Sequence, residues 1–522
     1  MLFSFVNLGH LVRLGRAGFV LAREGVLSGV DPRTVPVEAR LPLALAKLIA
    51  RRNVDRGVTR LPAAITRLGP SYIKLGQFLA TRPDVVGAAA VRELESLRDR
   101  VPPFPQAVAI ATVEAAFDKP LDQVFSSFSE PVAAASIAQV HRARVAADGR
   151  EVAVKVARPG VARLFRRDLS DMYFAARVAE RWLPDAKRLK PVEVVDTLAR
   201  SVTMEMDFRI EAAAASEFGE NAQGDNDFRV PAIDWNLTAK DVLTLDWVNG
   251  TSLSDLDVLR AEGFDLPDIG RIVVQSFLRH AVRDGFFHAD MHQGNLFVDP
   301  EGKLVAVDFG IMGRLGLKER RFLAEILYGF ITRNYKRVAE VHIEAGYVPR
   351  KHRVEDFAQA IRAIGEPIHS RTADQFSMAK LLTLLFEITA LFDMRTRTEL
   401  VMLQKTMVVV EGVARTLDPK LNLWATSEPV VRSWIEENLG PIGKIQDVGI
   451  SLTSLYQAAV ALPEILTRGE RILSNLEDAA EEGLGLSAET VEGIARAESR
   501  RIRWLTLALW IIAIVLVWRT VL

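Results

Sequence analysis

The sequence contains no cysteine. This absence excludes disulfide frameworks, thiolate metal sites and thiol nucleophiles, and it is typical of a protein kept in a reducing compartment such as the cytoplasm. Net charge is also absent, because 66 Lys and Arg residues balance 66 Asp and Glu residues. A global electrostatic attraction to nucleic acid is therefore not expected. The chemistry of the chain has to come from oxygen and nitrogen side chains that are placed locally.

A long run without charged residues occurs near the C-terminus, from Trp504 to Trp518, and Arg500, Arg501 and Arg503 precede it. As a helix, residues 504–522 would extend roughly 28 Å, close to the hydrocarbon core of about 30 Å in a bilayer. Tryptophan near each end is typical of a membrane interface, and a basic flank stays in the cytoplasm. We therefore predict a C-terminal transmembrane anchor over residues 500–522. A buried core helix is the alternative interpretation.

Two motifs with a specific spacing lie near residue 300. The first reads His288-Ala-Asp290-Met-His292-Gln-Gly-Asn295, and the second, Asp308-Phe-Gly, begins 18 residues after Asp290. Kinase-like catalytic loops place an Asp and an Asn five positions apart and supply a second Asp in an Asp-Phe-Gly turn. In that chemistry Asp290 positions the nucleophile, while Asn295 and Asp308 hold Mg²⁺ against the phosphates of ATP. The predicted cofactors are ATP and Mg²⁺ or Mn²⁺.

The order of predicted elements agrees with this chemistry. Residues 1–115 have a mostly helical pattern, and alternating β patterns appear only after about residue 130, first as a hairpin over 139–156. Helices, a strand, the catalytic loop and a second hairpin follow, and the remainder is helical. We predict an α+β, two-lobed protein-kinase-like fold with an N-terminal helical extension at 1–115, an N-lobe at 116–250 and a helical C-lobe at 251–495.

Lys155 stands in Val-Ala-Val-Lys155, where kinases carry the strand lysine that neutralises the α- and β-phosphates. Val152, Val154 and Val156 share one face of this strand, so Lys155 points to the other face. Such a lysine needs a carboxylate to orient it. Glu205 and Glu211 are the candidates, and on a single helix they would lie about 600° apart, facing different directions. They can therefore serve two different lysines.

The segment that precedes this hairpin is rich in alanine where a kinase has its glycine-rich loop. Glycine lets backbone N–H groups approach a phosphate with free choice of φ, and alanine restricts that freedom. We expect a stiffer nucleotide-binding loop that cradles phosphates differently. Its residues are Ala133, Ala134, Ala135, Ser136, Ile137, Ala138, Gln139 and Val140.

The most specific motif of the chain is Lys74-Leu-Gly76-Gln77. Lys74 and Gln77 are three residues apart, so they share one face of a helix. With this motif the chain resembles the UbiB family of atypical kinase-like proteins over roughly residues 30–320. The resemblance implies that the extension folds over the active site and blocks the usual path of a protein substrate. It implies that Glu205-x-Asp207 meets Lys74, that Glu211 pairs with Lys155, and that the alanine-rich loop binds nucleotide.

The resemblance also implies a role in ubiquinone biosynthesis at a bacterial inner membrane, with the catalytic domain cytoplasmic. Expected partners are nucleotide, membrane lipid, quinone-precursor phenols and other ubiquinone-biosynthetic proteins; a homo-oligomer is compatible with the sequence, and nucleic acid is not expected. One departure is visible, because Gln293 stands where the family's loop usually has proline. Gln293 leaves the loop freer than proline would, and every charged or metal-binding position is retained.

Three functional interpretations follow from these residues. The first is a membrane-anchored Mg²⁺-dependent ATPase or small-molecule kinase that supports ubiquinone assembly. The second is a conventional protein kinase, against which the extension and the lack of an evident Ala-Pro-Glu after Asp308 argue. The third is a nucleotide-binding scaffold without catalysis, against which the presence of Lys155, Asp290, Asn295 and Asp308 argues.

Overall fold

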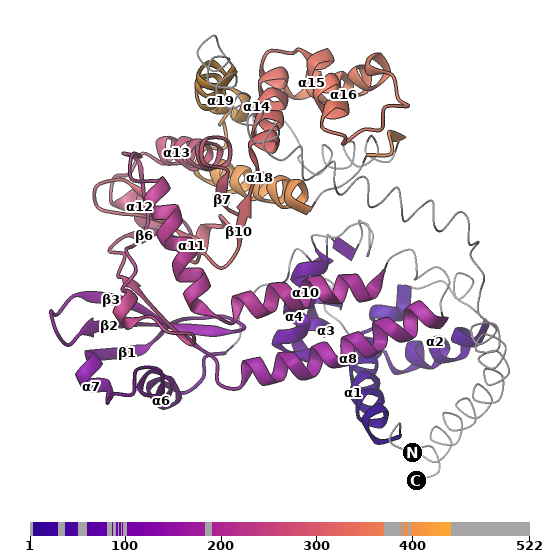
Figure 1. Cartoon of the computed structure of the whole chain (residues 1–522), viewed down its shortest axis with the longest axis vertical. Helices are drawn as coiled ribbons and strands as arrows, with labels where there is room; N and C mark the ends of the chain where they lie inside the picture. Colours follow the sequence, from indigo (N-terminus) through magenta and orange to yellow (C-terminus); the bar gives the residue numbers. More distant parts are fainter. Residues whose placement is uncertain are drawn as a thin grey trace, which may run out of the picture. The chain divides into compact units, whose positions relative to one another are not determined.

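The computed structural model of the chain (Figure 1) describes residues 4–29, 37–50, 60–80, 102–182, 190–369 and 398–439, together with residues 86, 90, 91, 93, 94, 97, 388 and 391–394. The chain divides into two compact units, Met1–Glu436 and Glu437–Leu522. Only the first three residues of the second unit are among those described. The elements and contacts that follow belong to the first unit.

A four-stranded antiparallel sheet forms the core of the N-lobe, in the order β1-β2-β3-β5. Valines at 152, 154 and 156 of β3 are fully buried, as their alternation predicts, and they pack with α6 and α7 on one face. The predicted hairpin over 139–156 is confirmed as β2 and β3, with Lys155 opposite Val140. The elements are α6 (Gln106–Phe117), α7 (Leu121–Val124), β1 (Phe125–Ala134), β2 (Ala138–Val145), β3 (Glu151–Ala157) and β5 (Val242–Asp246).

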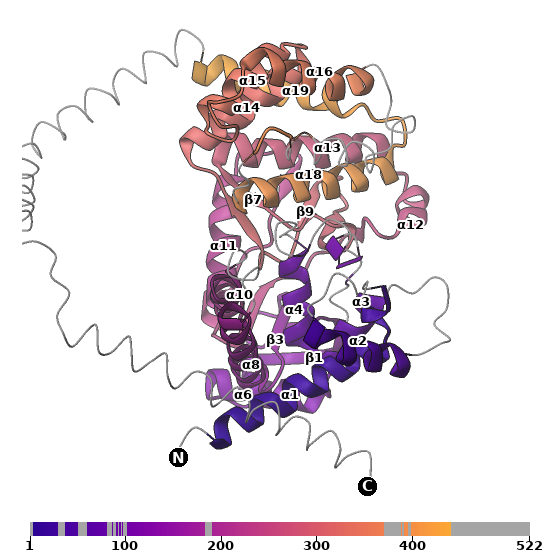
Figure 2. The same cartoon turned by 90° about the vertical axis from the view of Figure 1, so that its right-hand side faces the viewer.

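A helix that precedes this sheet in the sequence packs against two helices that lie between β3 and β5 in the sequence. Tyr72, Leu75 and Phe78 on α4 contact a core made by α8 and α10, and Figure 2 shows α4 near these two helices. At Gly76 of α4 a Cβ atom would lie 2.5 Å from a methyl carbon of Leu97, so a larger residue here would require the Leu97 side chain to move. The helices are α1 (Ser4–Arg23), η1 (Val26–Gly29), α2 (Val37–Ile49), α3 (Arg60–Leu68), α4 (Pro70–Leu79), α8 (Val161–Trp182), α10 (Pro191–Glu205) and α11 (Phe208–Asn221).

The C-lobe is built mainly from helices around a short sheet in the order β4-β9-β8-β6, and β7 pairs with β10. β4 (Phe228–Arg229) precedes residue 251 but pairs with β9 of this sheet, whereas Leu237 of the short turn η2 (Trp235–Leu237) packs on the core of the N-lobe sheet. The other elements of the C-lobe are β6 (Thr251–Ser252), α12 (Leu256–Ala261), α13 (Leu266–Arg279), the π-turn η3 (His280–Asp284), β7 (Phe286–His288), η4 (Gln293–Asn295), β8 (Leu296–Val298), β9 (Leu304–Ala306), β10 (Met312–Arg314), α14 (Leu317–Ile331), α15 (Tyr335–Glu344), α16 (Val354–His369), α18 (Thr398–Leu417) and α19 (Leu423–Leu439).

Helix α18 lies alongside α13 in both views (Figures 1 and 2). Val273 and Phe277 of α13 and Val410 and Ala414 of α18 belong to one buried core, which also contains the segments that carry the catalytic loop. At Gly270 of α13 a Cβ atom would lie 3.3 Å from the carbonyl oxygen of Ala414, so the two helices approach each other closely. This core is the support on which the site is built.

The predicted location at a bacterial inner membrane, with a single C-terminal span, is contradicted. Within the described ranges no helix is both long and apolar enough to cross a bilayer. Even α18, with 20 residues, carries Glu399, Lys405, Glu411 and Arg415 along its length, and charged side chains in a bilayer are costly. Residues 500–522, on which the prediction rests, lie outside the described residues. We withdraw that localisation.

Candidate functional site

The centre of the site is Lys155, which lies between two carboxylates. Its Nζ donates to Glu211 Oε1 at 2.7 Å and Oε2 at 3.0 Å, and to Asp308 Oδ1 at 2.9 Å. The lysine comes from β3, Glu211 from the first turn of α11, and Asp308 follows β9. The structure thus brings Lys155 together with Glu211, 56 residues later in the chain, and with Asp308, 153 residues later.

These contacts shift the pKa values of all three groups. Burial alone would lower the pKa of Lys155, but the charges of Asp308 and Glu211 raise it well above its ordinary value. Burial raises the pKa of Glu211 despite the opposing charge of Lys155, and the negative charge of Asp308 adds to the rise. Burial also works against ionisation of Asp308, yet Lys155, His288 and Lys74 together lower its pKa. Asp308 is therefore the more firmly ionised of the two carboxylates.

Asp308 has an unusual backbone and an accessible carboxylate. Its φ of 63° lies in the left-handed region, which costs a non-glycine residue energy and is concentrated at functional sites. The side chain is 48% exposed, against 9% for Glu211. A Cβ atom on Gly310 would lie 3.3 Å from Asp308 Oδ1, so glycine keeps that side of the carboxylate clear. Phe309 anchors the turn by packing on Phe218 of α11.

The catalytic loop is held by its own hydrogen bonds. The backbone N–H of Asp290 donates to His288 Nδ1 at 3.1 Å, and Asn295 Nδ2 donates to the carbonyl of Asp290 at 3.0 Å. This last bond uses the amide nitrogen of Asn295, and the amide oxygen is the atom able to bind a metal. Gln293 begins the 3₁₀ turn η4 and its carbonyl accepts from Ser252 Oγ at 3.2 Å, so the loop closes without proline.

The described side chains around Asp308 could hold a divalent metal only together with ligands from outside the protein. Among the described residues there is no group of three or more His, Cys, Asp or Glu side chains that could hold a metal ion. Mg²⁺ does not require such a cage, because it is usually bound by one or two protein oxygens together with phosphates and water. His288 is occupied within the loop, since its Nε2 contacts the carbonyl of Val307 at 3.2 Å. The donors left for a nucleotide-bound metal are Asp308 and Asn295.

Lys74 forms a second ion pair at the site. Its Nζ lies 2.7 Å from Glu205 Oε2, and the two side chains are 11% and 14% exposed. The structure thus pairs Glu205 with Lys74, as the resemblance implied, whereas Asp207 caps α11 by accepting from the N–H of Arg209 and also pairs with the Arg209 side chain. Gln77 lies half-buried on α4, three residues after Lys74. The charge of Lys74 also contributes to lowering the pKa of Asp308, so the extension reaches the site electrostatically.

The interpretation of Glu205 and Glu211 on one continuous helix is wrong. Helix α10 ends at Glu205 and α11 begins at Phe208. Asp207 has extended backbone angles and its side chain caps α11, which breaks the helix there. The two carboxylates still serve two different lysines, but the break between the helices separates them, not the helical rotation alone.

The alanine-rich segment is largely strand and not a loop. Ala133 and Ala134 end β1, Ala138, Gln139 and Val140 begin β2, and only residues 135–137 form the turn. Gln139 is buried and binds both backbone groups of Phe104, which anchors the turn. Ser136 is fully buried, and its hydroxyl has no hydrogen-bond partner within the described part of the chain. A buried hydroxyl of this kind needs an acceptor, and a phosphate oxygen would supply one if a nucleotide binds at this turn.

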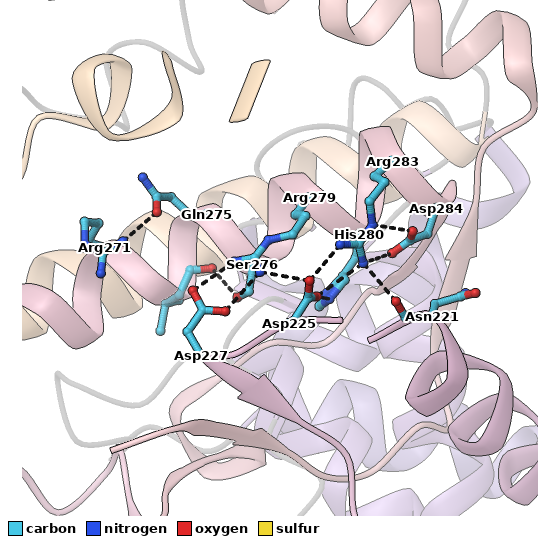
Figure 3. Close-up of polar contacts among 11 residues, drawn as sticks. Asn221, Asp225, Asp227, Arg271, Gln275, Ser276, Arg279, His280, Arg283 and Asp284 are labelled. Carbon is cyan, nitrogen blue, oxygen red and sulfur yellow. Dashed lines mark hydrogen bonds and ion pairs between the residues drawn. The ribbon is translucent and has the colours of Figure 1, made fainter. Parts of the chain in front are cut away.

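A further cluster of charges, which the sequence did not point to, lies between the end of α11 and the catalytic loop (Figure 3). The buried Asp225 accepts from His280 Nε2 at 3.0 Å and from Arg283 Nη1 at 2.7 Å, and Arg279 Nη1 lies 3.0 Å from it. Arg279 also binds Asp227. No pattern in the sequence marks Asp225 as buried, because it stands in a polar stretch that reads as a solvated turn.

Comparison with known proteins agrees with this geometry. Residues 96–342 match the ABC1 atypical kinase-like domain, and residues 361–422 match the UbiB helical domain. The chain is 37% identical to the "Probable protein kinase UbiB" of Marinobacter nauticus over 464 residues, which is 88% of this chain and 84% of that protein. A solved complex of Rv3197 with erythromycin, from Mycobacterium tuberculosis, shares 25% identity and a TM-score of 0.46, covering 71% of this chain and 91% of that one. The chain belongs to the UbiB family of ABC1 atypical kinase-like proteins.

Proposed function

We propose that the protein is an atypical kinase that binds Mg²⁺–ATP and hydrolyses it or transfers its phosphoryl group to a small acceptor in support of ubiquinone biosynthesis. The observation that carries this proposal is the position of Lys155 between the buried Glu211 and the half-exposed Asp308. Glu211 orients the lysine, and the lysine presents its charge where the phosphates of a nucleotide would lie. The ubiquinone role rests on membership of the UbiB family.

Each residue of the site has a place in this proposal. Lys155 would bind the phosphates, and the buried hydroxyl of Ser136 would add a donor to them. Asp308 and the amide oxygen of Asn295 would hold Mg²⁺, which when bound neutralises charge that develops on the transferring phosphoryl group. Asp290, whose side chain is 35% exposed, would accept the proton of an attacking hydroxyl or position a water.

The N-terminal extension favours a small acceptor. Lys74 of α4 pairs with Glu205 and acts on the pKa of Asp308, so this part of the surroundings of the site is occupied by the chain itself. We assign residues 1–115 to the extension, 116–250 to the N-lobe and 251–495 to the C-lobe, of which the structure describes residues up to Leu439. Quinone-precursor phenols are the acceptors or effectors that the family role suggests, and other ubiquinone-biosynthetic proteins are the expected partners.

Asp308→Asn tests the proposal most simply. Removal of this metal-binding charge should lower Mg²⁺-dependent ATP turnover by the full-length protein about a hundredfold. Asp257→Asn is the matched control, because Asp257 is 99% exposed and lies on α12; its turnover should equal that of the wild type. The assay is run with and without phospholipid and quinone-precursor phenols. Turnover by Asp308→Asn that equals the wild type would contradict the proposal.

A protein acceptor is the second candidate, because the Marinobacter relative is named a probable protein kinase. Stimulation of ATP turnover by a phenol would support the small acceptor. Transfer of labelled phosphate to a protein in trans by the wild type, lost in Asp290→Ala, would support the protein acceptor instead. The two outcomes are distinct, because the first requires no second protein in the assay.

A further inference from the structure

The residue just before the catalytic aspartate is held by a side chain from a distant helix. The carbonyl oxygen of Ala289 accepts a hydrogen bond from Thr406 Oγ1 at 3.1 Å, across 117 residues of sequence. Thr406 lies on α18 and is fully buried. Ala289 lies within the residues matched by the kinase-like domain, and Thr406 within those matched by the helical domain. The bond therefore joins the two matched regions at the catalytic loop.

With this bond, both polar groups of the peptide between Ala289 and Asp290 have a side-chain partner. The carbonyl of the Ala289–Asp290 peptide binds Thr406, and the N–H of the same peptide donates to His288 Nδ1 at 3.1 Å. With both polar groups engaged, the plane of the peptide before Asp290 is held in one orientation. The carbonyl of Asp290 in turn accepts from Asn295 Nδ2 at 3.0 Å. The backbone on both sides of Asp290 is thus set by side chains.

Packing holds Thr406 in position for this contact. Ala289 and Met291, which flank Asp290, lie in the same buried core as Leu403 and Val410 of α18. Thr406 Oγ1 is also 2.9 Å from the carbonyl of Met402 in its own helix. A hydroxyl has a single hydrogen, so the hydrogen is shared between the loop and the helix. Core packing alone would be served equally well by valine, and the hydroxyl is what distinguishes threonine here.

We propose that Thr406 of the helical domain is a positioning residue for Asp290, acting through the carbonyl of Ala289. Helix α18 then supports the catalytic loop through a hydrogen bond as well as through packing. This inference rests on the proposed function for its activity readout, and on the contacts of the loop for its structural readout.

The variants Thr406→Val, Thr406→Ser and Thr416→Val separate this role from packing. Valine keeps the shape of Thr406 and removes its hydroxyl, while serine keeps the hydroxyl. Thr416 is the matched control, because it is an exposed threonine of the same helix whose hydroxyl donates to the carbonyl of Gly412 at 2.8 Å. All variants are made in the full-length chain, and two quantities are measured: the kcat and KM for Mg²⁺–ATP turnover, and hydrogen–deuterium exchange of residues 286–296.

Thr406→Val should lower kcat about tenfold while the KM for ATP changes less than about twofold. The reason is that the Thr406 hydroxyl acts on the position of Asp290 and not on nucleotide binding. Exchange over residues 286–296 should be faster in this variant. Thr406→Ser and Thr416→Val should match the wild type in both measurements. Thr406→Ala, which also lacks the hydroxyl, decides the question where the valine variant does not fold.

Two results would overturn the inference. One is wild-type kcat and wild-type exchange in Thr406→Val. The other is equal impairment in Thr406→Ser and Thr406→Val, which would mean that packing and not the hydroxyl matters. Absence of ATP turnover in the wild type would count against the proposed function alone, and exchange over residues 286–296 would then decide the role of Thr406.

Discussion

A cluster of charged side chains lies at each end of helix α11, and the two clusters differ in how completely their carboxylates are paired. At its N-terminal end, in what we call the Lys155 cluster, a single lysine lies between the carboxylates of Glu211 and Asp308. Just past its C-terminal end, in what we call the Asp225 cluster, the buried carboxylate of Asp225 lies among Arg279, His280 and Arg283. Arg279 also pairs with Asp227, and Arg283 also pairs with Asp284. In the Lys155 cluster one cation serves two carboxylates, whereas in the Asp225 cluster several basic groups surround one buried carboxylate and have further acidic partners of their own.

The difference shows which cluster is open to a ligand. Both oxygens of Asp225 have two basic partners each, Oδ1 with Arg279 and Arg283 and Oδ2 with His280 and Arg283. Because a carboxylate has about four acceptor positions, this group is saturated within the protein. Asp308 instead has a half-exposed carboxylate and shares one lysine with Glu211. The Lys155 cluster therefore has room for a further cation, which under the proposed function is a nucleotide-bound metal, whereas Asp225 has no free acceptor position.

The Asp225 cluster connects the helix that carries Glu211 to the segment that leads to Asp290. Asp225 follows the helix that carries Glu211, while His280 and Arg283 lie in the π-turn that leads into β7 and the catalytic loop. Arg314 of β10 adds a pair with Glu217 of α11. The same helix is thus tied to Lys155 at one end and to the segment that precedes Asp290 at the other.

The largest expected effect comes from breaking the Lys155 cluster. Lys155→Met should lower Mg²⁺–ATP turnover by at least about a hundredfold, because the phosphates lose their main cation. Steady-state ATP turnover by purified full-length protein measures this effect. Lys318→Met, a change of an exposed lysine on α14, is the control and should turn over ATP at the wild-type rate. A Lys155→Met variant with full turnover would mean that this cluster does not bind nucleotide.

Breaking the Asp225 cluster should act on stability instead. Asp225→Asn leaves the charges of Arg279 and Arg283 without their buried partner and should lower the free energy of unfolding by about 3 kcal/mol. Urea denaturation measures the change. Glu217→Gln, which removes an exposed ion pair on the same helix, should cost less than about 1 kcal/mol. Equal losses in the two variants would show that the Asp225 cluster is no more than a surface network.

The stabilisation that Asp225 contributes should decrease at acidic pH. Burial opposes ionisation of Asp225, but His280, Arg283 and Arg279 lower the pKa of this carboxyl below its ordinary value of 3.8. The stabilisation is therefore fully present above pH 3.8 and is lost as the pH falls below it. His280 contacts Asp225 and titrates in the same range, because burial lowers its pKa while Asp225 raises it, so the comparison is made in a His280→Phe background. There the difference in unfolding free energy between Asp225 and Asp225→Asn should be constant from pH 7 to 5 and smaller by about 1 kcal/mol at pH 3. A difference that grows on acidification would contradict the assigned direction.

The sequence predicted those parts of the site that follow from local spacing. Alternating valines placed Lys155 on the open face of β3, and the intervals between Asp290, Asn295 and Asp308 predicted one catalytic loop. The resemblance to a family supplied the partners of Lys74 and Lys155, which spacing left open. The alanine-rich segment was misread as a loop, because alanine in a strand gives no β pattern of its own.

Contacts between distant segments could not be predicted in this way. Asp225 looks like a solvated turn residue until α13 brings Arg279, His280 and Arg283 around it. The hydroxyl of Thr406 looks like an interruption of an apolar stripe until the fold places it against Ala289. Both depend on tertiary packing, which no window of sequence contains.

The central claim is that the Lys155 cluster awaits a metal-bound nucleotide, and the dissociation constant of ATP with and without Mg²⁺ tests it most directly. If Asp308 ligates the metal as proposed, calorimetric titration of the full-length wild type should show that Mg²⁺ tightens ATP binding about tenfold or more. In Asp308→Asn the same addition of Mg²⁺ should leave the dissociation constant nearly unchanged. An equal tightening by Mg²⁺ in the wild type and in Asp308→Asn would contradict the account.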